Sequence, residues 1–297
     1  MRYIDEPTIA SVLRMADLIP VMRRAMIDYS LGRIAQPTRR FFAVEPHAGF
    51  FGSMPAAGGG TLGAKLVTVY PGNARKGLHT HQALVVLFRP ETGEPLVTMD
   101  GRLITEMRTA AVTAVYVDAV AAPDVRSLAV LGAGTQAKSH IQALSHVRRF
   151  DEIRIWNRMQ RRAEQLAEET GGTAVSREEA VRDADVVVAA TSSPEPVLEG
   201  KWLRAGAKVA SVGWSGPNGA ELDADAMANV VIVDSREGTA AESGNIRRYG
   251  AKVYAELGEV LAGARPIDPD ATVVFDSIGM ACQDIAAAAL VHERLTA

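Results

Sequence analysis

Apolar positions near the amino end recur every three or four residues, which is the spacing of an amphipathic helix. The pattern covers residues 8–31 and contains two successive apolar runs: Ile9, Val12, Leu13 and then Leu18, Val21, Met22, Ala25. Gly32 follows, and glycine commonly ends a helix. We therefore predict helices over residues 8–31.

The pattern then changes to short apolar segments separated by turn residues. We predict four strands here, over residues 49–54, 63–70, 83–88 and 96–99. Turn sequences such as Pro71-Gly72-Asn73 separate them. Strands joined by short turns predict an antiparallel sheet, distinct from the alternating elements that follow it.

Two basic residues lie at unusual places in this pattern. Lys65 is in phase with Val67 on the apolar side of the strand predicted over residues 63–70. Because burying an unpaired ammonium is unfavourable, either its stem reaches the surface or it projects into a polar cavity. Arg108 falls in the first turn of a helix predicted to start at Thr105, where the helix dipole disfavours a cation. Arg108 therefore either binds an anion or is an ordinary surface arginine.

From Leu128 onward strands and helices alternate. Four apolar residues run into the segment Gly132-Ala133-Gly134-Thr135-Gln136-Ala137, and a helical pattern follows. Gly132 permits a tight turn, and Gly134 removes a side chain where a phosphate would approach. Ala137 lets helix and strand pack closely, and the first helical N–H groups point at the anion. This arrangement predicts a dinucleotide pyrophosphate site.

Further apolar segments support the same interpretation. Strands are predicted over residues 153–156, 185–190, 208–212 and 230–233, and each ends in small or polar residues. The carboxyl ends of the strands are where an open parallel sheet binds its ligands. The pattern therefore predicts a Rossmann-type doubly wound α/β domain after the antiparallel one.

The end of the second predicted strand indicates which cofactor is bound. NAD-binding versions of this fold carry an acidic residue there, whereas this chain has Asn157 followed by Arg158. A guanidinium can hold a 2′-phosphate through paired hydrogen bonds, and Arg161 and Arg162 add positive charge nearby. We expect NADP(H) to be preferred, with NAD(H) possible.

Composition excludes several classes of protein. The 297 residues are 47% apolar and 23% charged, as in soluble globular proteins, and the net charge of -3 without a basic run gives no case for nucleic acid. The single cysteine, Cys282, cannot form an intrachain disulfide and is expected to be a small buried apolar residue.

We expect a cytoplasmic protein that has no contact with membranes. Residues 1–6 lack the apolar core of a signal peptide, and the most apolar stretch, 109–123, is too short to span a bilayer. We expect no metal site, because His79 and His81 alternate without an evident third ligand.

Eight segments, taken together and in order, resemble the ornithine cyclodeaminase/mu-crystallin family over essentially the whole length. They are residues 63–67, 80–83, 99–101, 108–111, 132–137, 221–223, 255–260 and 277–284. The resemblance implies a homodimer and two domains. Residues 1–118 with 277–297 would form an α+β substrate-binding and dimerisation domain, and residues 119–276 the Rossmann domain.

The resemblance also implies roles for particular residues. Arg39, Lys65 and Arg108 would bind the substrate and act in catalysis, with Arg40 a rival for Arg39, and Glu242 and Ser215 would lie near the substrate. The NADPH-binding mu-crystallin branch implies a larger cofactor set. It comprises Thr80, His81, Gly132, Ala133, Gly134, Thr135, Gln136, Asn157, Arg158, Arg162, Thr191, Val212 and Ser277.

One departure from the family pattern bears on the reaction. Cyclodeaminases of this family carry an aspartate at the position of Ser215, and a neutral hydroxyl cannot replace that base unaided. The resemblance therefore implies an NADPH-dependent reductase of cyclic ketimine carboxylates of the pyrroline-2-carboxylate or piperideine-2-carboxylate type. The alternatives are an alanine-type dehydrogenase, a cyclodeaminase with another base, and a non-catalytic NADPH-dependent binder of small molecules.

Overall fold

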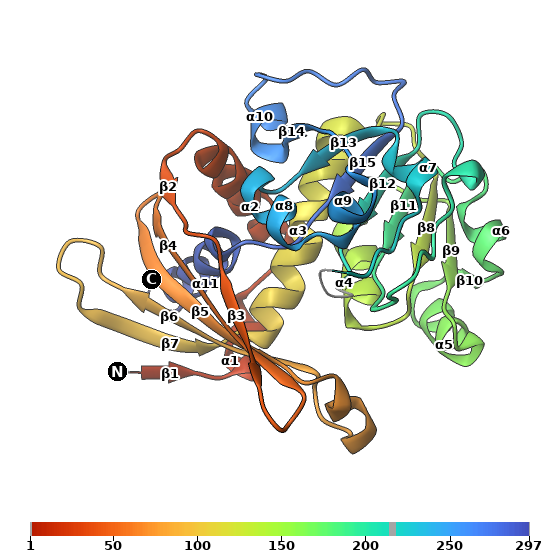
Figure 1. Cartoon of the computed structure of the whole chain (residues 1–297). Coiled ribbons are helices and arrows are strands. Elements are labelled where there is room, and N and C mark those ends of the chain that lie inside the picture. Colours follow the sequence, from red (N-terminus) through yellow and green to blue (C-terminus); the bar gives the residue numbers. More distant parts are fainter. Residues whose placement is uncertain (1, 214–217, 297) are drawn as a thin grey trace. The chain divides into compact units, whose positions relative to one another are not determined.

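The computed structural model describes residues 2–213 and 218–296, and the chain forms two compact units (Figure 1). The first unit comprises Met1–Arg108 and Met280–Ala297, and the second comprises Thr109–Gly279. The first division falls inside helix α3 (Arg102–Val120), whereas the sequence suggests one after residue 118. The second boundary between the units falls after Gly279, whereas the sequence suggests a boundary after residue 276.

The first unit starts with strand β1 (Arg2–Ile4) and helices α1 (Glu6–Val12) and α2 (Met15–Ser30). The Asp5 side chain accepts the Thr8 N–H at 3.0 Å and so caps α1. Gly32 adopts a φ of 70° just after α2. The helices predicted over residues 8–31 are confirmed, with a break between the two.

The sheet of the first unit has the order β1-β7-β6-β5-β4-β2, with β3 also paired to β4. Its further strands are β2 (Ile34–Ala35), β3 (Arg40–Val44), β4 (Gly49–Gly58), β5 (Thr61–Val69), β6 (His81–Phe88) and β7 (Pro95–Asp100). Helix η1 (Pro71–Lys76) joins β5 to β6. The expected antiparallel pairing holds for β2 to β7, but β1 runs parallel to β7, so the sheet is mixed.

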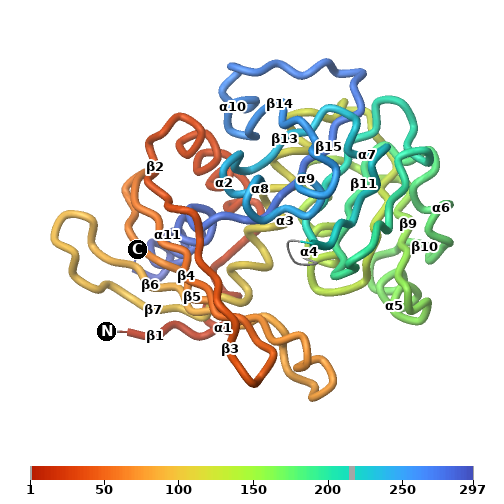
Figure 2. The backbone as a smooth tube through the Cα atoms, viewed as in Figure 1, coloured from red at the N-terminus to blue at the C-terminus, as the bar shows by residue number. Residues whose placement is uncertain are grey.

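Alternation along β5 separates the two faces of this sheet. Lys65 and Val67 are buried, whereas Leu66 is exposed on the opposite face. The carboxy-terminal helix α11 (Ala281–Thr296) packs against α2 and against β4, β5 and β6, as the tube in Figure 2 shows. The last helix therefore belongs to the first unit, as the resemblance implies.

The second unit is built on an eight-stranded sheet of order β10-β9-β8-β11-β12-β15-β13-β14, in which every neighbouring pair is parallel. Its strands are β8 (Ser127–Leu131), β9 (Glu152–Trp156), β10 (Thr173–Ala174), β11 (Val186–Ala189), β12 (Lys208–Ser211), β13 (Val230–Val233), β14 (Val253–Glu256) and β15 (Val273–Asp276). The doubly wound domain is confirmed. Strands β10, β14 and β15 are additional to those predicted.

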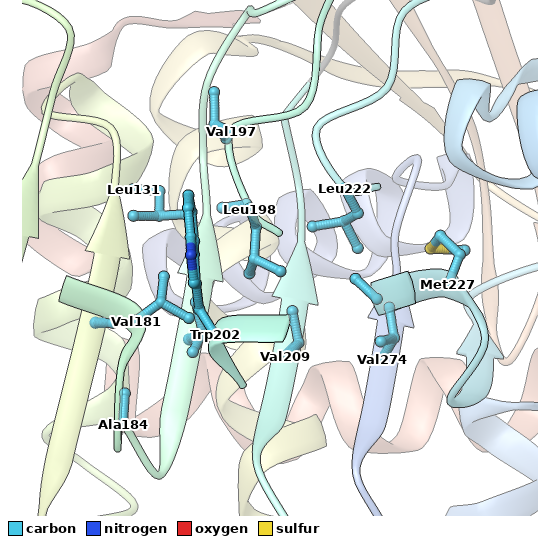
Figure 3. Packing of buried hydrophobic residues seen from close by; sticks show 14 of the residues in the cluster. Leu131, Val181, Ala184, Val197, Leu198, Trp202, Val209, Leu222, Met227 and Val274 are labelled. Atoms are coloured by element: carbon cyan, nitrogen blue, oxygen red, sulfur yellow. The ribbon is translucent and has the colours of Figure 1, made fainter. Parts of the chain in front are cut away.

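The helices of this unit follow its strands. They are α4 (Thr135–Leu144), α5 (Gln160–Thr170), α6 (Arg177–Val181), η2 (Gly200–Trp202), α7 (Ala224–Met227), α8 (Arg236–Glu242), α9 (Gly244–Tyr249) and α10 (Leu257–Leu261). One core cluster packs the strand residues Leu131 and Val209 against Trp202, Leu198 and Leu222 (Figure 3). Every residue of β11 is buried, as expected for a parallel strand that is covered on both faces.

Within residues 2–213 and 218–296, no helix is both long and apolar enough to cross a membrane.

Candidate functional site

A buried charge cluster lies in the first unit. The Lys65 Nζ is 2.6 Å from Asp284 Oδ2 in an ion pair. Arg108 donates from Nε to Asp284 Oδ1 at 2.9 Å and from Nη1 to Gln283 Oε1 at 2.7 Å. All four side chains are buried. Two cations share one carboxylate, so the cluster retains a net positive charge that suits an anionic ligand.

Three elements bring these side chains together. The alternation of β5 turns Lys65 inward, and the first turn of α11 supplies Asp284. Arg108 lies in the second turn of α3, because that helix begins at Arg102, where the Asp100 side chain accepts the Arg102 N–H at 2.8 Å. The prediction that Arg108 lies in the first turn of its helix is therefore wrong, and its guanidinium is held by side chains of α11.

The cluster perturbs its own ionisation. Burial lowers the pKa of Lys65 to about 8; the Asp284 carboxylate opposes this shift, and the charges of Arg108 and Arg39 add to it. Burial by itself would raise the pKa of Asp284, but Arg108 and Lys65 outweigh burial and the pKa is lowered. Asp284 is therefore ionised at neutral pH, and the pKa of Lys65 lies closer to neutrality than that of an ordinary lysine.

The structure brings Arg39 towards this cluster. Its positive charge contributes to the lowered pKa of Lys65, and its guanidinium carbon lies 5.4 Å from the centre of the Phe41 ring. Arg40 is exposed at the start of β3 and faces Ser53 of β4. Arg39 is thus the arginine of this pair whose charge acts on Lys65.

His81 is half-buried at the start of β6. Burial, followed by the charges of Lys65 and Arg108, lowers its pKa to about 4 against the opposing influence of Asp284. Its imidazole is therefore neutral at physiological pH. Thr80 and His79 are exposed. Among the residues that the structure describes, no group of three or more potential ligands could hold a metal ion.

The glycine turn of the second unit has the features that a dinucleotide pyrophosphate requires. Gly132 adopts a φ of 125°, and a Cβ there would lie 2.4 Å from the Ala190 carbonyl oxygen. A Cβ on Gly134 would meet nothing within 4 Å, so open space lies in front of it. Helix α4 begins at Thr135 without a side-chain cap, which leaves its first N–H groups for an anion. The turn fits the cofactor that the sequence predicts.

Positive charge gathers where β9 ends. The Asn157 side chain donates to the Met159 carbonyl at 3.0 Å, which tightens this turn. Arg158, Arg161 and Arg162 are exposed, and none of them forms an ion pair with a described residue. Three guanidinium groups are therefore available for a phosphate ligand.

Three of the expected cofactor residues follow neighbouring strands of the parallel sheet. Thr191 is the second residue beyond β11, and Val212 and Ser277 come directly after β12 and β15. Val212 donates its N–H to the Ala189 carbonyl at 2.9 Å, and Ser277 donates its hydroxyl to Asp234 Oδ2 at 3.0 Å. They lie along the edge where this fold binds its ligands.

Other expected site residues are not grouped in this way. Glu242 ends α8 in the second unit, whereas Arg39, Lys65 and Arg108 belong to the first. Its role towards the substrate stays a prediction. Ser215 lies outside the described residues.

Sequence reasoning assigned no role to several buried polar residues. Gln283 and Asp284 complete the cluster of the first unit, and Glu221, Asn245 and Asp276 form a hydrogen-bonded network in the second. The sequence feature that could have indicated these residues is an acidic or amide residue within an otherwise apolar segment, as in Ala220-Glu221-Leu222. A buried polar residue needs partners, and those partners are distant in the sequence.

Similar proteins share this architecture. Ketimine reductase mu-crystallin of Mus musculus is 42% identical over 285 residues, which cover 93% of this chain and 91% of that protein. The structure of Thermococcus litoralis Δ1-pyrroline-2-carboxylate reductase in complex with NADH and L-proline is 31% identical, with a TM-score of 0.95 over 100% of this chain and 98% of that one.

An archaeal alanine dehydrogenase dimer with bound NAD is 29% identical, with a TM-score of 0.94 over 100% of this chain and 96% of that one. The family model of the ornithine cyclodeaminase/mu-crystallin family matches residues 5–297. The chain therefore belongs to the ornithine cyclodeaminase/mu-crystallin family.

Proposed function

We propose that the protein is an NADPH-dependent reductase of cyclic ketimine carboxylates and forms cyclic amino acids. The buried cluster of Lys65, Arg108 and Asp284 carries this proposal, because its net positive charge suits a small carboxylate and its lysine titrates near neutrality. The similarity to a ketimine reductase and to a reductase whose structure is in complex with NADH and L-proline supports the same substrate class.

In the proposed reaction, Arg108 and Arg39 bind the substrate carboxylate and so fix the position of the imine carbon. Protonated Lys65 donates a hydrogen bond at the ring nitrogen and favours the iminium form, whose carbon is the better electrophile. The nicotinamide cofactor, when bound, supplies the hydride. Lys65 passes its proton to the ring nitrogen and regains one from solvent, while the hydride adds to the imine carbon, which gives the cyclic amino acid.

A direct assay tests the proposal. Purified protein is supplied with NADPH and Δ1-pyrroline-2-carboxylate or Δ1-piperideine-2-carboxylate, and consumption of NADPH is followed by absorbance. We expect turnover with at least one of these imines. Tight NADPH binding without turnover of any imine or oxo acid would instead identify a small-molecule binder.

An alanine-type dehydrogenase is the second candidate, because the archaeal alanine dehydrogenase shares the fold over the whole chain. An enzyme of this type reduces an open-chain oxo acid together with ammonia, so pyruvate, ammonia and NADPH test this alternative in the same assay. A cyclodeaminase is tested separately, because it would release ammonia from ornithine in the presence of NAD. Faster turnover of pyruvate than of either cyclic imine would favour the dehydrogenase.

We propose NADP(H) as the preferred cofactor because the exposed residues Arg158, Arg161 and Arg162 follow the end of β9 closely in the chain, and no acidic residue stands among residues 157–162. Replacing Arg158 with glutamine is expected to weaken NADPH binding about tenfold or more and to leave NADH binding within about twofold, because only NADPH carries the 2′-phosphate. Dissociation constants measured by calorimetry check this. Arg149→Gln, an exposed arginine on another loop, is the control. Equal loss of both cofactors, or tighter binding of NADH by the wild type, would refute the assignment.

We also propose a homodimer formed by the outer face of the first unit's sheet. Phe42 and Phe51 are cross-strand partners on this face, with ring centres 5.4 Å apart, and Leu66 is 36% exposed nearby. An apolar sheet face of this kind is typical of an interface. The archaeal relative was solved as a dimer.

Replacing Leu66 with aspartate is expected to convert the dimer to a monomer, because an unpaired carboxylate would be buried between the copies. Light scattering coupled to size-exclusion chromatography measures the mass. Tyr254→Asp, at an exposed aromatic residue of the second unit, should leave the mass unchanged. A wild-type monomer, or a Leu66→Asp dimer, would contradict the assignment of this face.

A further inference from the structure

Glu221 joins the carboxyl ends of two neighbouring strands of the second unit. Its Oε1 accepts hydrogen bonds from the backbone N–H and the hydroxyl of Thr191, both at 2.6 Å, just beyond β11. Its Oε2 accepts from the Gly213 N–H at 2.8 Å and from the Ser211 hydroxyl at 2.9 Å, at the end of β12. The side chain is buried, and each of its oxygens is held by two donors.

The neighbouring groups fix the direction of these bonds. The Thr191 hydroxyl oxygen accepts the Ser193 N–H at 3.2 Å, and the Ser211 hydroxyl oxygen accepts from Asn245 Nδ2 at 3.0 Å. Both hydroxyl protons are therefore directed to Glu221, whose oxygens accept from four donors. Burial raises the pKa of Glu221, and the hydrogen bonds from Thr191, Gly213 and Ser211 oppose that shift by favouring the carboxylate. A side chain at Gly213 would not fit, because its Cβ would lie 2.4 Å from Glu221 Oε1.

Asn245 holds Glu221 from the opposite side. Its Oδ1 accepts the N–H groups of Glu221 at 3.0 Å and Leu222 at 3.2 Å, which fixes the orientation of the amide. Its Nδ2 also donates to Asp276 Oδ1 at 2.8 Å, at the end of β15. The network thus ties the ends of three adjacent strands, β11, β12 and β15, into one buried assembly.

The place of this assembly in the sheet relates it to one half of a dinucleotide. In doubly wound folds the pyrophosphate lies at the glycine turn after the first strand, and the two halves of the dinucleotide lie over strands on either side of it. Here the turn follows β8, and Arg158 follows β9 on one side. Glu221 lies on the other side, at β11 and β12, which is where the nicotinamide half would bind.

We propose that Glu221 is a positioning residue that fixes the backbone at Thr191 and Gly213 for the nicotinamide half of the cofactor. The inference rests on the proposed use of a nicotinamide cofactor and extends it to a residue that need not touch the ligand. Glu221 should affect the binding of the nicotinamide half and not of the other half of the dinucleotide. A general contribution of Glu221 to stability would affect both halves equally.

The test compares two ligands on Glu221→Gln. All four partners of Glu221 are donors, and in glutamine an amide NH2 replaces one of the two oxygens. Two of the four donors then face another donor and lose their acceptor, so the strand ends separate. We expect the dissociation constant of NADPH to rise about tenfold or more, while that of 2′-phospho-ADP-ribose, which lacks nicotinamide, stays within about twofold. Both constants are measured by calorimetry on the full chain.

Asp185 provides the matched control. It lies at the amino ends of the strands, where its Oδ2 accepts the N–H groups of Arg126 at 2.8 Å and Ser127 at 2.9 Å. Asp185→Asn removes a carboxylate that accepts backbone hydrogen bonds in the same unit. It should lower the melting temperature and leave the ratio of the two dissociation constants, for NADPH and 2′-phospho-ADP-ribose, unchanged. Ser211→Ala, which removes one of the four donors, should show the Glu221→Gln pattern at about threefold and serves if that variant does not fold.

Three outcomes decide the matter. The inference is supported if Glu221→Gln or Ser211→Ala weakens the binding of NADPH but not of 2′-phospho-ADP-ribose, and Asp185→Asn does not. Equal weakening of both ligands, or no change in either, overturns it. If the wild type binds NADH and not NADPH, the proposed cofactor preference fails, and the same comparison with NADH and ADP-ribose still decides the role of Glu221.

Discussion

Replacing Lys65 with methionine is expected to reduce turnover of a cyclic imine by about a hundredfold or more, because a positioned proton donor contributes about that much. Methionine is unbranched like lysine and only one atom shorter, while the ammonium that pairs with Asp284 at 2.6 Å is lost. NADPH binding should stay near the wild-type value, because the glycine turn and Arg158 lie in the other unit. Steady-state kinetics and calorimetry on the same preparation measure both quantities.

Lys76→Met is the matched control, because Lys76 is an exposed lysine of η1 in the same unit. It should leave kcat and KM unchanged. An unchanged rate in Lys65→Met would remove the lysine from the mechanism. A parallel loss of NADPH binding would instead indicate a general failure of the fold.

Replacing Asp284 with asparagine is expected to destabilise the protein by about 3–5 kcal/mol, because two buried cations lose their shared counter-charge. Lys65 and Arg108 lie 2.6 and 2.9 Å from its oxygens. Asp28→Asn is the matched control: Asp28 is also buried in the first unit, but its partners Arg24 and Arg33 are largely exposed. Urea unfolding curves should show a smaller loss for Asp28→Asn, whose activity should be unchanged.

The same Asp284→Asn variant has an expected signature in pH. The pKa of Lys65 is about 8 in the folded protein and 10.5 ordinarily, so between these values the unfolded chain holds a proton that the folded chain has lost. Stability therefore rises with pH across this window. In the Asp284→Asn variant the pKa of Lys65 falls further, because the opposing influence of Asp284 is removed.

The proposed reaction uses protonated Lys65, so kcat/KM should decline as the pH rises through the pKa of Lys65. In Asp284→Asn this alkaline decline should move to lower pH, and a decline at the wild-type pH would contradict this account.

Local patterns predicted most of the fold. The run into Gly132 and the apolar strands after it were sufficient for the parallel sheet, because period and glycine placement are local signals. Strand β15 was missed: its four residues take their place between β12 and β13 through pairing with distant segments. The start of α3 was placed at Thr105, because the Asp100 side chain that accepts the Arg102 N–H is a capping contact without periodicity.

The candidate site was predictable only in part. Lys65 was conspicuous as a charge on an apolar face, but the sequence left open whether it reached the surface or a polar cavity. The structure shows a buried ion pair. Its partner Asp284 is also the partner of Arg108, 176 residues away, so no local pattern connects them. Glu221 was missed for the same reason, because its four donors become neighbours only when β11 and β12 pair.

The order of the chain has a consequence for biosynthesis. The carboxylate that pairs with Lys65 and Arg108 is carried by α11, which follows the whole of the second unit, Thr109–Gly279, in the chain. While a ribosome is still adding the second unit, the segment up to Arg108 contains two cations that are buried in the folded protein, and Asp284 has not yet been added to pair with them. The second unit can therefore acquire its native contacts during synthesis, and the buried charge cluster is completed only after α11 leaves the ribosome.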